Sequence, residues 1–226
     1  MAMVMLRLLQ GLCLVAFLPL FTAAQPSPTP EGSAVTFILD FPDSQPQHYS
    51  IHVNSSGPGR YESRGHPSPE SDAPDNFAFE FAISAELRAR IFALAARAGY
   101  FQKDVDSHRK NMAFTGQKTL RYQDARRSGE STYNYSANAA VQDLTNLFQN
   151  LSSTLEFGHR LDYDHRYQKL ALDEELKRMQ EMADTHMLAE VAAIQPILEE
   201  IIADQSVVNI ARSRAQRLLV LAGNRP

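Results

Sequence analysis

The stretch from Phe77 to Phe101 changes its hydrophobic period partway along, and it specifies the best-defined elements of the chain. Its first part carries a large apolar side chain at every second position, namely Phe77, Phe79, Phe81 and Ile83. This alternation predicts a strand with one apolar face. Its second part follows the spacing of an amphipathic helix, with Leu87, Ile91, Leu94, Ala95 and Ala98 on one stripe. Ser84 is the predicted N-cap and Gly99 the predicted stop. The helix is the nearest cover for the apolar face of the strand.

Short β-prone runs separated by turn residues predict five more strands. They cover residues 34–41, 49–53 and 60–63 before the Phe77 strand, and residues 118–122 and 131–135 after the first helix. Residues 138–157 return to helical spacing, and Gly158 is the predicted stop. The predicted order is therefore β-β-β-β-α-β-β-α. We expect an α+β fold in which one small antiparallel sheet is covered on one face by helices 84–98 and 138–157.

The last third of the chain is predicted to be mainly helical. Apolar stripes at helical spacing occur over residues 167–187, after Pro196, and from Val207 to Leu219. Residues 196–221 resemble one helix pair of a HEAT-like repeat, and a single pair is too few for a solenoid. We expect an α+β domain at residues 34–158 and a helical segment at residues 159–226. The segment is predicted either to contact another chain through an exposed apolar patch or to complete the core of a monomer.

A strand, a glycine turn and a short second strand precede the first helix. The strands are His48-Tyr49-Ser50-Ile51-His52-Val53 and Arg60-Tyr61-Glu62, and the helix opens at Ile83-Ser84 and ends Ala98-Gly99-Tyr100-Phe101. In this order, residues 34–101 resemble a domain of unknown function in exported bacterial proteins, where a Y-S-V-x-I strand and its partner precede a helix ending A-x-F-F. The resemblance implies a fold and an exported location, and it transfers no active residue. The paired cysteines that precede the first strand in that family are absent here.

The first residues have the pattern of a secretory signal peptide. Arg7 gives a positive start, residues 8–21 are apolar, and Thr22-Ala23-Ala24 offers small residues for cleavage. We expect a signal peptide at residues 1–24, cleaved near Ala24, and a flexible linker at residues 25–33, with no membrane span left after cleavage. An uncleaved N-terminal anchor is the alternative. The only cysteine, Cys13, leaves with the signal, which excludes disulfides, cysteine nucleophiles and thiolate metal sites from the mature chain.

Histidines and aspartates are densest between His159 and His165. Such residues at short spacing can bind a metal, and a hydrolase could use His159, Asp162 and His165 if they converged in a cleft. The six-residue spacing of the two histidines does not place both on one helix face, and the neighbouring arginines would repel a cation. The alternative interpretation is a polar linker between helices, with aspartates that cap helix ends.

The segment between Lys103 and Arg127 has surplus positive charge, with tyrosines nearby on predicted strands. Basic groups beside tyrosines can recognise an acidic polymer or a partner surface. The candidate binding residues are Lys103, Arg109, Lys110, Lys118, Arg121, Tyr122 and Tyr133. The alternative is that these cations lie in water on strand edges, where they discourage edge pairing.

The remaining composition narrows the class of function. The chain has 226 residues and a net charge of −4, which gives no electrostatic footprint for nucleic acid. It lacks G-x-S-x-G, H-E-x-x-H and a phosphate-binding glycine loop. We therefore expect a secreted or periplasmic protein that is not an enzyme, has no cofactor or metal, and binds another envelope protein or a second copy of itself through its C-terminal helices.

Overall fold

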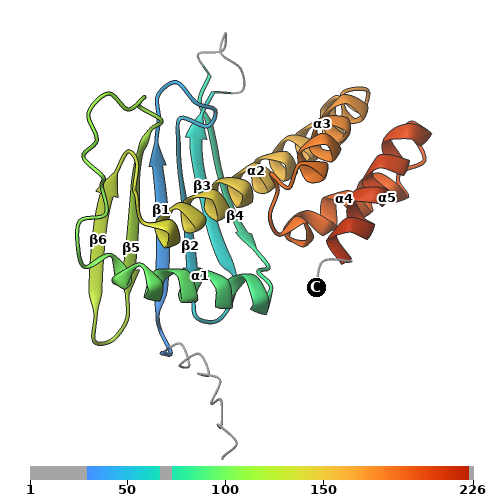
Figure 1. The fold of residues 1–226 in the computed structure, drawn as a ribbon. Coiled ribbons are helices and arrows are strands. Elements are labelled where there is room, and N and C mark those ends of the chain that lie inside the picture. The colour runs from blue at the N-terminus through green and yellow to red at the C-terminus, as the bar shows by residue number, and fades with distance from the viewer. Residues whose placement is uncertain (1–29, 67–72, 224–226) are drawn as a thin grey trace, which may run out of the picture.

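A computed structural model describes residues 30–66 and 73–223 of the chain. Its six strands form one antiparallel sheet in the order β4-β3-β2-β1-β5-β6 (Figure 1). The strands are β1 (Ala34–Asp40), β2 (His48–Asn54), β3 (Gly59–Gly65), β4 (Asp75–Phe81), β5 (Gln117–Gln123) and β6 (Ser128–Tyr133). The predicted α+β class and the predicted order of strands and helices are confirmed.

Five α-helices complete the described part of the fold. They are α1 (Ala85–Arg97), α2 (Ala139–Tyr167), α3 (Leu172–Asp184), α4 (Gln195–Ala203) and α5 (Asn209–Gly223), with short 3₁₀ turns η1 (Gly99–Phe101) and η2 (Val191–Ile194). Helices α1 and α2 lie on one face of the sheet, whereas α3, α4 and α5 gather around the far half of α2, beyond the sheet (Figure 1). The N-cap prediction is confirmed, because the Ser84 hydroxyl accepts the Leu87 N–H at 3.2 Å.

The helix-covered face of the sheet consists of three rows of side chains that cross all six strands. The lowest row runs Phe81–Gly59–Val53–Val35–Tyr122–Gly129, the middle row runs Phe79–Tyr61–Ile51–Phe37–Leu120–Ser131, and the upper row runs Phe77–Ser63–Tyr49–Leu39–Lys118–Tyr133. Both glycines of the lowest row make room for a neighbour. A Cβ on Gly59 would lie 2.4 Å from the Phe81 ring, and one on Gly129 would lie 2.1 Å from the Tyr100 carbonyl oxygen.

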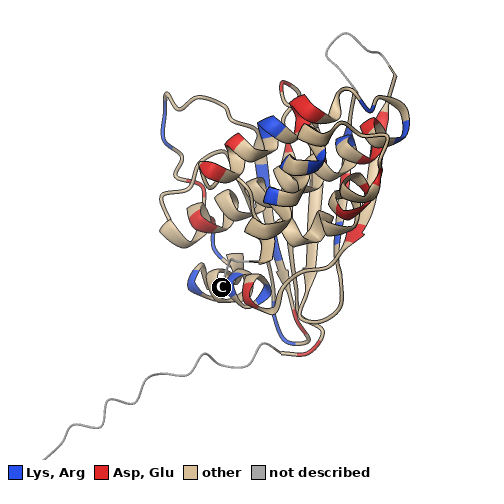
Figure 2. Cartoon of the chain, turned by 90° about the vertical axis from the view of Figure 1, so that its right-hand side faces the viewer, with Lys and Arg blue, Asp and Glu red and all other residues tan. Residues whose placement is uncertain are grey.

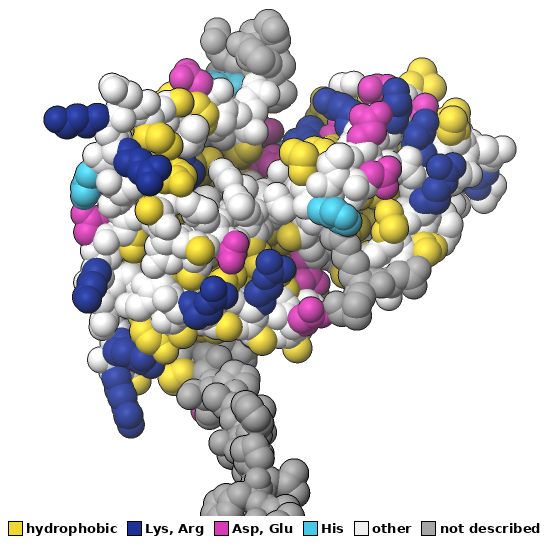
Figure 3. Space-filling model, in the orientation of Figure 1, with side chains coloured by type: hydrophobic (Ala, Val, Ile, Leu, Met, Phe, Trp, Pro, Cys, Tyr) yellow, Lys and Arg dark blue, Asp and Glu magenta, His cyan; other side chains and the backbone are white. Residues whose placement is uncertain are grey.

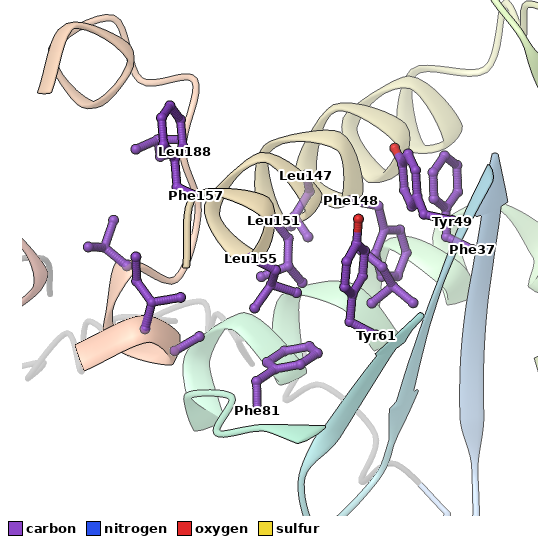
Figure 4. Close-up of a cluster of buried hydrophobic side chains, with 14 of the residues drawn as sticks. Phe37, Tyr49, Tyr61, Phe81, Leu147, Phe148, Leu151, Leu155, Phe157 and Leu188 are labelled. Atoms are coloured by element: carbon purple, nitrogen blue, oxygen red, sulfur yellow. The ribbon is translucent and has the colours of Figure 1, made fainter. Parts of the chain in front are cut away.

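The two covering helices lie mainly over the lower and middle rows. On α1, Phe92 meets Tyr122 edge-on with ring centroids 6.4 Å apart, and on α2 Phe148 stacks on Phe37 at 5.2 Å. Figure 4 shows Phe148 and Leu151 of α2 on the side of the helix that faces Phe37 and Tyr61 of the sheet. The upper row lies beside α2, and it becomes the floor of the groove described below.

Helix α2 overturns two of the predictions. Gly158 does not end it, because the helix continues for nine residues to Tyr167. Gly158 is instead required by packing, since a Cβ there would lie 2.5 Å from Cγ2 of Ile194 in η2. Residues 159–166 are therefore helical and not a linker, and the predicted boundary between residues 158 and 159 falls inside one helix.

The C-terminal helices continue the core of the sheet domain through α2. Their inward side chains are fully buried at Leu172, Leu176, Met179, Leu198, Ile201, Ala211, Ala215 and Leu218. Exposed apolar side chains include Val208 and Ile210 at the start of α5 and Val220 and Leu221 near its end. The predicted signal peptide, and the predicted linker up to residue 29, lie outside the described residues; Ser33, expected in the linker, is buried and hydrogen-bonded to Pro30.

Candidate functional site

A groove lies beside α2 on the helix-covered face of the sheet. Two hollows of about 390 Å³ and 410 Å³ share Gln149 as a common wall residue. The floor consists of four neighbours of the upper row, Tyr49, Leu39, Lys118 and Tyr133. The wall is a polar stripe of α2, formed by Gln142, Asn146, Gln149, Ser153 and Glu156. We call this site the α2 groove; Figure 3 views the face on which it lies.

The sequence contains a spacing pattern for the polar stripe, but the apolar pattern of the same helix does not reveal it. Its positions are separated by four, three, four and three residues, which places them on one side of a helix. The apolar stripe of residues 138–157 predicts only the buried side of the helix. The polar stripe borders both hollows, so that amide, hydroxyl and carboxylate groups lie along the full length of the groove.

Lys118 is the most unusual group in the α2 groove. The residue is 4% exposed, and its Nζ donates to four oxygens at 3.0–3.1 Å: the Thr115 carbonyl and hydroxyl, the Gly116 carbonyl and the Asn134 carbonyl. All four acceptors are neutral, and in the described part of the chain no carboxylate pairs with this ammonium group. Desolvation by burial lowers the pKa of Lys118, as expected for a cation with no opposite charge beside it.

Around Lys118 the groove is rich in neutral polar groups. The Tyr133 hydroxyl lies 2.5 Å from the Thr145 hydroxyl, and burial raises the pKa of Tyr133. The Tyr135 hydroxyl accepts from Gln142 Nε2 at 2.9 Å, and the Arg109 guanidinium lies 5.8 Å from the centre of the Tyr135 ring. This end of the groove therefore presents one buried and one exposed cation among hydroxyl and amide groups.

At the other end, tyrosine hydroxyls rise from the sheet toward α2. The Tyr61 hydroxyl donates to Glu156 Oε1 at 2.7 Å and lies 3.0 Å from the Ser152 hydroxyl. Burial raises the pKa values of Tyr49 and Tyr61. Both hydroxyls point away from the sheet beside Phe148 (Figure 4). Tyr61 thus holds the Glu156 carboxylate against the sheet at this end.

A second charged cluster closes this end of the groove. The buried Glu175 carboxylate is paired with Arg160 at 2.5 Å and with Arg178, and both arginines line the groove. Glu175 and Glu156 together carry two negative charges against these two arginines, so the end near α3 is close to neutral. The uncompensated charge of the groove is concentrated at Lys118.

The seven residues predicted as a binding surface do not form one surface. Lys118 and Tyr133 lie together in the α2 groove, and Arg109 lies near its rim through Tyr135. Arg121 lies on the opposite face of the sheet and pairs with Glu130 at 2.5 Å. Tyr122 is buried beneath Tyr100, with ring centroids 4.6 Å apart.

Lys103 and Lys110 are exposed in the segment between η1 and β5. Part of this segment follows the edge of β6, where the Val105 N–H donates to the Ser131 hydroxyl and the Ser107 N–H to the Tyr135 carbonyl. Figure 2 shows charges of both signs interspersed over the helices on the side it views. Because the seven predicted residues are divided between the α2 groove, the opposite face of the sheet, the buried core and this segment, they do not form a single basic face.

The three residues of the hydrolase hypothesis take separate partners. His159 lies 3.1 Å from Asp75 of β4, Asp162 pairs with Arg166, and His165 lies 3.0 Å from Asp204. His159 and Asp162 line a common cleft, whose lining includes no serine, threonine or cysteine, and His165 is not part of it. Among the described residues, no three His, Cys, Asp or Glu side chains are arranged to hold a metal ion.

Two general findings complete the description of the candidate site. Over the ranges 30–66 and 73–223, the structure contains no helix of the length and apolar character needed to cross a membrane. No protein-family model and no curated protein sequence matches the chain. Function must therefore be inferred from the chemistry of the groove.

Proposed function

We propose that this protein is an exported, non-catalytic binding protein whose α2 groove receives an extended acidic segment of a partner protein. The observation that carries the proposal is the buried ammonium group of Lys118, which has neutral oxygens but no carboxylate around it. Export is supported by the signal-like residues 1–24.

The electrostatic argument concerns the cost of burying a charge. A desolvated cation that is hydrogen-bonded only to neutral groups keeps much of its desolvation penalty, because a neutral dipole offsets less of it than an opposite charge does. A ligand carboxylate in the adjoining hollow would supply that charge. Asp106, the acid on this side, already accepts the backbone N–H groups of His108 and Asn134. A negatively charged ligand is therefore favoured over a neutral or positive one.

The shape of the site indicates an extended ligand. Two hollows that share Gln149 make a long depression, and its polar wall repeats at the spacing of successive helical turns. Amide side chains such as those of Gln142, Asn146 and Gln149 can both donate to and accept from a peptide backbone. A peptide with acidic side chains fits both the length of the groove and its charge.

Fluorescence polarisation tests the proposal with three labelled peptides, (Glu-Ala)₄, (Gln-Ala)₄ and (Lys-Ala)₄. We expect the acidic peptide to bind best. Asn146→Glu and Gln149→Glu place a negative charge in the groove wall and should each weaken its binding about fivefold to tenfold, by like-charge repulsion near a partly desolvated site. Gln216→Glu adds the same charge to the exposed side of α5 and serves as the matched control.

Two results would overturn the proposal. One is equal binding of the acidic and neutral peptides, which would show that the buried cation is not read by the ligand. The other is an equal effect of Gln216→Glu and Gln149→Glu, which would place binding outside the groove. Circular dichroism of each variant confirms that the fold is retained.

A further inference from the structure

A second cleft lies on the other side of α2, between the edge strand of the sheet and the C-terminal helices. It has a volume of about 300 Å³ and is formed by Phe77 and Phe79 of β4, His159 and Asp162 of α2, and Ile197 and Glu200 of α4. We call it the β4 cleft. Its α2 residues lie on the helix face opposite the polar stripe, so it is separate from the α2 groove.

The floor of the β4 cleft is a ladder of three stacked rings. Phe77 and Phe79 lie with centroids 5.9 Å apart and planes 14° apart, and Phe77 stacks on the His159 ring at 4.1 Å and 19°. Phe81, the next phenylalanine on the same strand face, is buried, whereas Phe77 and Phe79 remain partly exposed. Partly exposed aromatic rings at a strand edge form the kind of apolar surface on which a ligand can lie.

Most of the carboxylates at the rim already have partners. Asp75 lies beside His159 at 3.1 Å, and Asp162 pairs with Arg166 at 2.7 Å. These two pairs fix the aromatic ladder and one side of the opening. Asp75 lies outside the cleft lining, and Asp162 and Arg166, which belong to it, offset each other's charge.

Glu200 is the second carboxylate of the lining and is more accessible than Asp162. Its side chain is 63% exposed, and its only ion-pair contact in the described residues is His165 Nδ1 at 3.9 Å. His165 is itself closer to Asp204, at 3.0 Å. Among the lining residues, Asp162 and Glu200 outweigh Arg166, so the opening of the cleft has a net negative charge above a floor of aromatic rings.

We propose that the β4 cleft binds a small organic cation with an aromatic or aliphatic body. Aromatic faces attract cations through their quadrupoles, and a carboxylate at the rim adds a direct charge contact. The volume is that of a small-ligand site, at the lower end of the usual range. Charge complementarity excludes an anion of the same shape. This inference is independent of the function proposed for the α2 groove.

Isothermal titration calorimetry with a matched set of probes tests this inference on the full mature protein. The probes are 2-phenylethylamine, neutral 2-phenylethanol and anionic 3-phenylpropanoate at pH 7. We expect the amine to bind about tenfold more tightly than the alcohol, from the combined cation–π and carboxylate contacts. The propanoate should show no detectable binding.

Two variants separate the contributions of the carboxylate and of the aromatic ring to amine binding. Glu200→Gln should weaken amine binding roughly twofold to fivefold and leave alcohol binding unchanged. The matched control is Glu199→Gln, at the preceding residue of α4 and outside the cleft lining, which should have no effect on amine binding. Phe79→Leu keeps an apolar side chain but removes one ring face, and it should weaken the amine more than the alcohol.

The inference is overturned if the amine and the alcohol bind equally, because charge would then play no part. It is also overturned if none of the probes binds, or if Glu199→Gln and Glu200→Gln weaken amine binding to the same extent. Because Glu200 is largely exposed, its variant tests the charge contact without loss of the fold.

Discussion

Replacement of Gly158 by alanine separates two explanations for a glycine inside a helix. In an unobstructed helix interior, Gly→Ala stabilises by about 1 kcal/mol, because glycine loses more backbone entropy on folding. At this position the added methyl group would lie 2.5 Å from Ile194 Cγ2 and 3.2 Å from Ile194 Cβ. Overpacking of this kind costs about 1–3 kcal/mol. We therefore expect Gly158→Ala to lower the free energy of unfolding by about 1–2 kcal/mol.

A double-mutant cycle assigns this loss to one contact. Ile194→Ala removes the Cγ2 atom and should by itself cost about 2–4 kcal/mol, since Ile194 is buried. In that background Gly158→Ala should become neutral or slightly stabilising. The resulting coupling free energy is about 2 kcal/mol and lies within the range for residues in contact.

Urea unfolding followed by circular dichroism at 222 nm measures the four stabilities, with the slope checked for constancy across the set. If Gly158→Ala stabilises the protein by about 1 kcal/mol in both backgrounds, η2 does not pack against α2 as described. A coupling near zero would refute the same contact even if the single variant were destabilising.

Two pH-dependent predictions test other parts of the structure. Burial raises the pKa of Tyr49, Tyr61 and Tyr133 above the ordinary value of 10.0. The stability that these tyrosines contribute is therefore present below pH 10 and is lost as the pH rises further. The urea concentration at the midpoint of unfolding should fall steeply above pH 10, and less steeply in Tyr61→Phe. An unchanged alkaline slope in that variant would contradict the burial of the Tyr61 hydroxyl. Hydrogen bonds from Lys169, Ser206 and His165 lower the pKa of Asp204 below 3.8. Asp204→Asn should therefore have a lower melting temperature than the wild type at pH 7. The difference in melting temperature should disappear as the pH falls below 3.8. Asp143→Asn, an exposed site on α2, is the control for Asp204 and should show no such convergence.

The order of the secondary structure was predictable because local patterns determine it. Period-two alternation at Phe77, Phe79 and Phe81 and the Ser84 cap act over a few residues, and the structure agrees with both. The predicted end of α2 was wrong because glycine has two structural roles. It ends helices through a left-handed backbone, and it also admits close packing, and only the contact with Ile194, thirty-six residues later, distinguishes them.

The candidate binding residues show a similar limit. Lys118 and Arg121 are three positions apart in a strand, so alternation alone places them on opposite faces of the sheet. Charge clustering in the sequence obscured that separation. Lys118 lies beside the polar stripe of α2 because of the strand order and the path of a helix that begins twenty-one residues later. No local sequence pattern contains that information.

The position of β1 in the middle of the sheet has a consequence for how the chain folds. The first strand to emerge needs two partners, and the second of them, β5, lies about eighty residues further along the chain. Such distant pairing closes a long loop before it gains contacts, which slows folding. Strands β1 to β4 pair with their neighbours in chain order, so this part of the sheet can form before β5 has been made, whereas β5 and β6 can join only afterwards. The sheet is therefore expected to grow from the β1–β4 side, with β1 as the open edge to which β5 and then β6 are added.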